Sequence, residues 1–245
     1  MEKSLNICHL YADMLNLYGD VGNVIVLADR ARRRGIEVTV KNISLGERID
    51  FAQFDLLVIG GGQDEQQQMV AGELADWRGA DLRAGIEADL VTLAVCAGYQ
   101  LLGQSYRATD GCMIACAGAL DMHTVGGETR MIGDVLFMWE DIPVIGFENH
   151  SGKTYLGNSV QPLGKVVKGF GNNGEDGTEG ARYRNVFGTY SHGPLLPKNP
   201  KLADRLLELA LVRKYGEADL VPLDDTLENK AHQMMLERFE GLKGQ

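Results

Sequence analysis

The chain has 245 residues, of which 44% are hydrophobic and 24% charged, and its formal net charge at pH 7 is −10. This length suits one α/β domain with extensions or two small domains, and the composition is ordinary for a soluble globular protein. The negative charge argues against nucleic acid as a partner and against attachment to anionic lipid. No signal-peptide pattern opens the chain, and no apolar run approaches the ~20 residues of a membrane span, so we expect no membrane insertion.

The first half of the chain alternates between strand and helix patterns. Strand patterns occupy residues 4–11, 36–43, 54–59 and 90–95, and helical patterns occupy residues 20–34 and 64–86. This alternation predicts an α/β fold with a central, mostly parallel sheet flanked by helices and joined by right-handed crossovers. The strand segments are near-continuous apolar runs, which is typical of buried parallel strands.

The second half of the chain changes character. Short β-like segments at 130–138 and 142–148 alternate with glycines, and residues 169–180 have the composition of a mobile surface linker. A late strand is predicted at 186–190. Two helices, at about 200–215 and 225–241, close the chain. Because we find no internal repeat and no strong domain boundary, we predict one domain over residues 1–245 that includes both closing helices.

The four cysteines are too few for a secreted disulfide scaffold of this size. Only Cys112 and Cys116 lie close together along the chain, and no second Cys or His pair at zinc spacing accompanies them. We therefore expect no metal site and a location in a reducing cytoplasm.

Cys96 lies where an apolar strand pattern gives way to a helical one, within the sequence Leu-Val-Thr-Leu-Ala-Val-Cys-Ala-Gly-Tyr-Gln-Leu-Leu-Gly of residues 90–103. A cysteine on this turn faces the free N–H groups of a helix N-terminus, which favour a thiolate. Gly98 permits close approach of another backbone or a ligand. A buried cysteine that merely packs as a small hydrophobe is the ordinary alternative. The strand–Cys–Gly–helix context instead predicts a nucleophile elbow with sulfur in place of oxygen.

A cysteine nucleophile needs a base, and the chain has five histidines. His192 follows the predicted strand at 186–190, and the end of a strand is where an open parallel sheet places its ligands. His150 also ends a predicted strand and is our second choice. The remaining three we interpret as structural: His9, His123 and His232.

Two further features suit the binding of a substrate. Gly60, Gly61 and Gly62 follow the third predicted strand, where glycines let backbone N–H groups point into a cleft and stabilise an oxyanion. Arg130 lies between a glycine pair and an apolar segment, and an arginine there is suited to clamp a substrate carboxylate. These residues predict a cysteine hydrolase or transferase that acts on an acyl or amide carbon, without naming the substrate.

Several of these motifs resemble those of a known family. Residues 95–103 resemble the nucleophile motif of triad-type, class I glutamine amidotransferases, and Gly-Gly-Gly-Gln at 60–63 resembles their oxyanion loop. Thr-Tyr-Ser-His-Gly-Pro at 189–194 resembles the histidine motif of the branch that includes cobyric acid synthase. Three more stretches make the chain most similar to the GatD-type glutaminase subunits of lipid II isoglutaminyl synthase: residues 16–23, 146–154 and 171–180.

The resemblance implies a single amidotransferase domain that hydrolyses L-glutamine to glutamate and ammonia through a thioester on Cys96. His192 would take the thiol proton and give one to the departing ammonia. The backbone N–H of Ala97, with one from the loop of Gly61 and Gly62, would hold the oxyanion. Two side chains would hold the glutamine itself: Gln100, and Arg130 through the α-carboxylate.

One departure from the family pattern concerns the third member of the triad. Many triad amidotransferases carry a glutamate two residues after the histidine, where this chain has Pro194. The branch resembled here shares this lack. We hypothesise that the carboxylate comes from a partner subunit, or from Glu148 or Asp20 in this chain.

The resemblance also implies a partner, a synthetase subunit that resembles the Mur ligases and forms a heterodimer with this chain. That subunit would activate the D-glutamate of lipid II and receive the ammonia, which forms D-isoglutamine in peptidoglycan. ATP and Mg²⁺ are expected on the partner and no cofactor on this chain, since it has no Gly-x-x-x-x-Gly-Lys-Ser/Thr loop. Three alternatives stay open: a subunit for another acceptor such as a corrin carboxylate, a non-catalytic scaffold subunit, and a cysteine peptidase.

Overall fold

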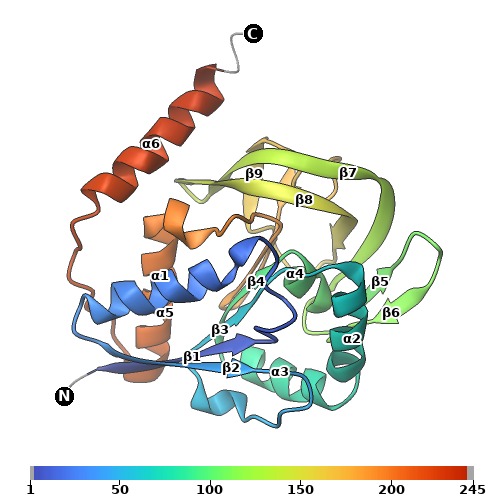
Figure 1. Cartoon of the computed structure of the whole chain (residues 1–245), viewed down its shortest axis with the longest axis horizontal. Coiled ribbons are helices and arrows are strands. Elements are labelled where there is room, and N and C mark those ends of the chain that lie inside the picture. The colour runs from blue at the N-terminus through green and yellow to red at the C-terminus, as the bar shows by residue number, and fades with distance from the viewer. Residues whose placement is uncertain (1–2, 242–245) are drawn as a thin grey trace.

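The main sheet is the mostly parallel one that the sequence predicts. A computed structural model describes residues 3–241, and six of its strands lie in the order β11-β12-β4-β3-β1-β2 (Figure 1). All neighbours run parallel except the edge pair of β11 and β12. Every residue of β3 and β4 is buried, as expected for central strands covered on both faces. The strand bounds are β1 (Ser4–Leu10), β2 (Glu37–Ile43), β3 (Leu56–Ile59), β4 (Val91–Val95), β11 (Ala181–Tyr183) and β12 (Val186–Thr189).

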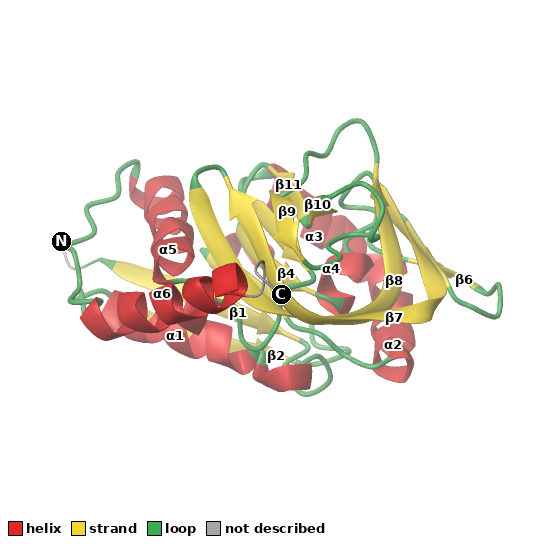
Figure 2. Cartoon of the chain, turned by 90° about the horizontal axis from the view of Figure 1, so that it is seen from above, coloured by secondary structure: helices red, strands yellow, loops and turns green. Residues whose placement is uncertain are grey.

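Helices cover both faces of this sheet. Helices α1 (Val21–Arg32) and α5 (Pro200–Tyr215) pack together on one side, and α2 (Asp64–Ala75) and α3 (Trp77–Glu87) pack together on the other (Figures 1 and 2). The helical pattern at 64–86 is confirmed, but as two helices and not one, because the chain leaves helical geometry at Asp76. Four further helical segments in the described residues are short: α4 (Ala97–Leu101), η1 (Leu17–Gly19), η2 (Phe51–Gln53) and η3 (Leu196–Lys198).

A second sheet stands beside the first and is built on a long antiparallel hairpin of β7 (Met122–Trp139) and β8 (Ile142–Leu156). Both strands are much longer than the segments expected at 130–138 and 142–148. The sequence pattern is interrupted there because the pairing shifts register between Gly126 and Met131, which breaks the alternation. The smaller strands of this sheet are β5 (Ser105–Arg107), β6 (Met113–Ala115), β9 (Gly164–Lys168) and β10 (Thr178–Glu179).

The segment at 169–180 is only partly the surface linker that its composition suggested, since residues 174–177 are exposed whereas residues 171–173, 179 and 180 are buried. Asn172 and Glu179 are completely buried, and the Tyr99 hydroxyl donates a hydrogen bond of 3.0 Å to Asn172 Oδ1. The carboxylate of Glu148 accepts the backbone N–H groups of Phe170 and Gly171. Polar side chains in this loop satisfy neighbouring backbone groups, and for that reason a polar, glycine-rich sequence forms a fixed wall of the molecule.

The two closing helices pack differently. The apolar face of α5 joins the main core, whereas α6 (Thr226–Gly241) lies on the outside against η3 and β8 (Figure 1). Arg30 of α1 pairs with both Asp204 of α5 and Asp225 just before α6. Within residues 3–241 no helix is long and apolar enough to cross a bilayer.

Candidate active site

Cys96 occupies a strained turn between β4 and α4. Its backbone has φ +51° and ψ −108°, a conformation that costs energy for a residue with a side chain. Its N–H donates to Thr189 O on the neighbouring strand at 2.8 Å. A Cβ added to Gly98 would lie 2.7 Å from Ile59 O, so the close approach expected at this glycine is present. This geometry is that of a nucleophile elbow.

His192 lies just beyond the end of β12, and its side chain lies near Cys96. It is completely buried, and its backbone pairs with Phe147 of β8 in both directions, so the second sheet holds the histidine loop. A methyl group added to Gly61 would lie 3.0 Å from His192 Cε1 and 3.3 Å from Cys96 Cβ. Cys96 and His192, the nucleophile and the base predicted from sequence, therefore both lie next to Gly61. Neither ring nitrogen of His192 has a hydrogen-bond partner among residues 3–241.

The carboxylate beside His192 is that of Asp20. Its Oδ2 lies 3.9 Å from His192 Nδ1, and both side chains are buried. Glu148, the other acid considered from sequence, has its Oε2 3.9 Å from Nε2 of His150 and otherwise holds the loop at 169–180. Of the two acids considered within the chain, the structure thus places Asp20 beside His192.

In the glycine loop after β3, the backbone N–H groups of Gly61 and Gly62 differ in whether they already have an acceptor. The N–H of Gly61 already donates to Asp20 Oδ2 at 2.7 Å. Gly62 lines the cavity above Cys96, and the N–H of Ala97 points at the sulfur. Of the two loop glycines, Gly62 is the one whose N–H has no acceptor among the described hydrogen bonds.

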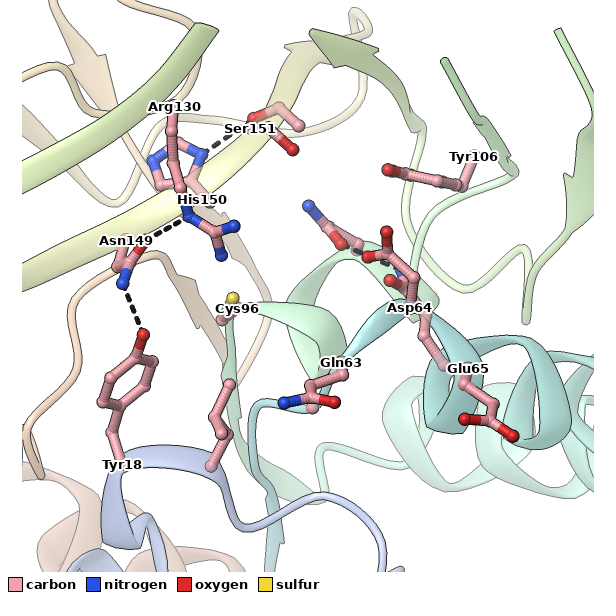
Figure 3. Close-up of a pocket in the computed structure, with 15 residues that line it drawn as sticks. Tyr18, Gln63, Asp64, Glu65, Cys96, Tyr106, Arg130, Asn149, His150 and Ser151 are labelled. Carbon is pink, nitrogen blue, oxygen red and sulfur yellow. Dashed lines mark hydrogen bonds between the residues drawn. The ribbon is translucent and has the colours of Figure 1, made fainter. Parts of the chain in front are cut away.

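A cavity of about 450 Å³ opens above Cys96 (Figure 3). Arg130 reaches into it from β7, and its Nε donates to Asn149 Oδ1. Asn149 in turn donates to the hydroxyl of Tyr18 on the opposite rim. Gln100 lines the floor, but its amide is already engaged, accepting from Gln67 at 2.9 Å and donating to the hydroxyl of Tyr190 at 3.0 Å.

The electrostatics of the site favour a neutral resting pair. Burial and the negative charge of Asp20 raise the pKa of Cys96 to about 12, against the opposing effects of the Ala97 N–H and of Arg130. Burial is also the main cause that lowers the pKa of His192 to about 3. Burial therefore opposes the thiolate expected from a helix N-terminus, because it outweighs the few aligned peptides of a five-residue helix.

Sequence reasoning missed some residues of this site. Tyr18 was part of a motif but had no assigned role, and its ring stands 5.0 Å from that of His192, edge to face. The backbone of Tyr18 has a φ of +60°, which is strained for a residue with a side chain, and the sequence does not reveal this conformation. The His150 ring stacks on Tyr190 with centroids 3.5 Å apart, so the second-choice histidine is a wall of the pocket.

Comparison with known proteins identifies the family of this α/β chain. The model of the CobB/CobQ-like glutamine amidotransferase domain matches residues 6–200. The chain belongs to this family. The protein is a class I amidotransferase with a single α/β amidotransferase fold, as its motifs predicted.

Several relatives of this CobB/CobQ-like amidotransferase are known by sequence. Lipid II isoglutaminyl synthase (glutamine-hydrolyzing) subunit GatD of Staphylococcus aureus is 40% identical over 235 residues, 96% of each chain. The subunit of the same name from Streptococcus pneumoniae is 40% identical over 98% of this chain and 92% of that protein. Cobyric acid synthase of Listeria innocua is 33% identical over 59% of this chain but only 29% of its own length.

Solved structures agree with the amidotransferase fold. A chain in the structure of PurLQS from Thermotoga maritima matches with a TM-score of 0.57 at 15% identity, over 86% of this chain and 98% of that one. A glutamine amidotransferase from the same organism matches with a TM-score of 0.52 at 14% identity, over 96% and 97%. Identities this low speak to the fold alone.

Within residues 3–241, no cluster of three His, Cys, Asp or Glu side chains is placed to hold a metal ion.

Proposed function

We propose that this chain is the glutaminase subunit of a lipid II isoglutaminyl synthase, hydrolysing L-glutamine and passing ammonia to the amidation of lipid II. The observation that carries the proposal is the meeting of Cys96 and His192 around Gly61, in a chain 40% identical to two GatD subunits over nearly its full length. A cysteine on an elbow beside an imidazole is suited to attack an amide carbon.

The first half of the reaction forms a thioester. Because both groups are neutral at rest, His192 accepts the thiol proton as Cys96 attacks the side-chain amide carbon of glutamine. The negative charge moves to the amide oxygen, where the N–H groups of Ala97 and Gly62 are the donors we assign to it. Gly61, the other loop glycine considered, keeps its N–H on Asp20 and so positions the acid.

The second half releases both products. The imidazolium of His192 gives its proton to the amide nitrogen, the C–N bond breaks and ammonia leaves. Water then gives a proton to the same imidazole and attacks the thioester, which yields glutamate and the free thiol of Cys96. While His192 is protonated, the carboxylate of Asp20 at 3.9 Å from Nδ1 opposes the cost of a buried positive charge.

Substrate recognition in this proposal uses the walls of the cavity. Arg130 binds the α-carboxylate of glutamine, for which a guanidinium offers paired donors. Gln100 supports the floor of the pocket through an amide that Gln67 and Tyr190 hold in one orientation. A cavity of about 450 Å³ falls within the range of small-molecule sites.

The remaining parts of the proposal concern the assembly. The partner is a synthetase subunit resembling the Mur ligases, bound as a heterodimer, and ATP and Mg²⁺ belong to it. No cofactor is required on this chain. Its free cysteines suit the reducing cytoplasm. We take α5 and α6 as parts of the same domain as residues 6–200, and a partner carboxylate stays the alternative to Asp20.

The test is amidation of lipid II by the reconstituted pair, with glutamine or with ammonium as the nitrogen source. Replacing the nucleophile, as in Cys96→Ala, should abolish glutamine-dependent amidation and spare ammonium-dependent amidation. Loss of both would assign the cysteine a structural role. Glutamine-independent peptide cleavage, or amidation of a corrin carboxylate in place of lipid II, would replace the proposal by one of its alternatives.

A further inference from the structure

Glutamine carries three polar groups, and the proposed function accounts for two of them. The side-chain amide lies at Cys96 and the α-carboxylate at Arg130, which leaves the α-ammonium group. An ammonium ion that loses water without gaining an acceptor is costly, so a site for free glutamine needs a negative or polar group facing that nitrogen. The inference below rests on the proposed function and concerns this third group.

Asp64 is the carboxylate that faces the cavity from the wall opposite Arg130. It is the first residue of α2, and its side chain points into the space between Cys96 and Tyr106 (Figure 3). The neighbouring Glu65 also lines the cavity, but its carboxylate is directed away from that space. The Asp64 side chain is exposed and takes part in none of the side-chain hydrogen bonds or ion pairs within residues 3–241, so its oxygens are available to a ligand.

The negative charge of Asp64 acts on the side chains of both Tyr106 and Cys96. After burial, it is the first cause that raises the pKa of Tyr106, and it adds to the larger effects of burial and Asp20 that raise the pKa of Cys96. Two wall residues of opposite charge, with the nucleophile below them, match the charge pattern of an amino acid whose side chain points at the sulfur.

We propose that Asp64 binds the α-ammonium group of L-glutamine and makes this site selective for free glutamine over amides that lack a charged amino group. The pairing of Arg130 with the carboxylate and Asp64 with the ammonium then fixes which way the side chain projects. The bound ammonium also cancels a negative charge that opposes the Cys96 thiolate, so the correct substrate helps to ionise its own nucleophile.

The experiment uses the full chain in complex with its partner subunit and measures ammonia release. Three substrates are compared: L-glutamine, its deamino analogue glutaramic acid, and N-acetyl-L-glutamine. The variant is Asp64→Asn, and the matched control is Glu65→Gln, which removes the same charge one residue away. Wild-type enzyme should prefer glutamine to glutaramic acid by about tenfold or more, the scale of one charged hydrogen bond.

Asp64→Asn should raise KM for L-glutamine about tenfold or more and leave kcat/KM for glutaramic acid unchanged or higher, so that the preference collapses. Glu65→Gln should keep the wild-type preference. An equal loss on both substrates in Asp64→Asn would assign the residue a structural role and overturn the inference. So would an equal collapse in Glu65→Gln, which would make the effect one of general charge. If the wild-type complex releases no ammonia from any of the three, the proposed function itself fails and this inference fails with it.

Discussion

The ring of Tyr18 stands edge-on over the ring of His192, with centroids 5.0 Å apart, and its hydroxyl accepts a hydrogen bond from Asn149. Asn149 also accepts the Nε–H of Arg130. One chain of contacts therefore runs from the proposed carboxylate site to the tyrosine ring that covers the His192 imidazole. Tyr18 keeps water from His192, and burial is what lowers the pKa of that histidine to about 3.

Removing the cover should move the acid limb of the pH profile. In Tyr18→Ala the His192 ring meets water, so its pKa rises toward the ordinary 6.5. Because the imidazole must be neutral to accept the thiol proton, kcat/KM at pH 5.5 should fall severalfold relative to the value at pH 8. Tyr18→Phe keeps the ring and loses only the bond to Asn149, so its acid limb should match the wild type. Superimposable profiles for the alanine variant and the wild type would show that Tyr18 does not shield His192.

The reactivity of Cys96 should report a neutral thiol at rest. Its pKa, raised to about 12 mainly by burial, predicts an alkylation rate that climbs about tenfold per pH unit from pH 6 to 9. Iodoacetamide labelling followed by peptide mapping measures this rate in a Cys112→Ser background, since Cys112 is exposed. A rate that is already level by pH 7 would instead indicate a thiolate–imidazolium pair.

Asp20 should lower stability at neutral pH and raise activity. Burial raises its pKa from 3.8 to about 7, so the folded protein favours the protonated acid below pH 7 and the carboxylate above it. Its contribution to stability is complete below pH 3.8 and is lost as pH rises through 7. Relative to Asp20→Asn, the wild type should lose up to about 1.4 kcal/mol of unfolding free energy per pH unit between pH 4 and 7, and no more above it. Denaturant unfolding at several pH values measures the difference, and a flat difference would contradict the assigned pKa.

The same variant tests which acid orients the histidine. Asparagine retains an acceptor for the Gly61 N–H but cannot balance an imidazolium, so glutaminase activity of the complex should fall about tenfold or more. Activity within twofold of the wild type would place the third carboxylate on the partner subunit. Activity of the isolated chain equal to that of the complex would count against a partner carboxylate.

Gly61→Ala should separate catalysis from folding. The new methyl group would press on His192 Cε1 at 3.0 Å and Cys96 Cβ at 3.3 Å and displace one of them. A displacement of this kind lowers kcat on the order of 100-fold. Gly72→Ala is the matched control, because nothing lies within 4 Å of its added carbon in the last turn of α2, and it should stabilise the helix by up to about 1 kcal/mol with unchanged activity. Wild-type kcat in Gly61→Ala would show that the two side chains are not packed around this glycine.

Local sequence patterns were sufficient to predict those structural features that a few consecutive residues encode. The strand before Cys96, the helix after it and Gly98 beside it are all encoded within residues 90–103, because strand period, helix period and glycine sterics act locally. His192 was predicted for the same reason, since it comes three residues after the end of a buried strand. The parallel sheet and the closing helices followed from apolar periodicity alone.

Tertiary structure decided what depends on segments far apart in the chain. Asp20 rather than Glu148 faces His192 because the turn after β1 and the end of β12 meet across the sheet, a contact that no local pattern records. Part of the polar loop at 169–180 is buried because β8 and α4 supply hydrogen-bond partners to it, while residues 174–177 stay exposed. The protonation of Cys96 and His192 is likewise set by how completely the surrounding layers exclude water. Composition and spacing identify the chemical groups, but the free energy of ionising them depends on burial, which only the packed molecule determines.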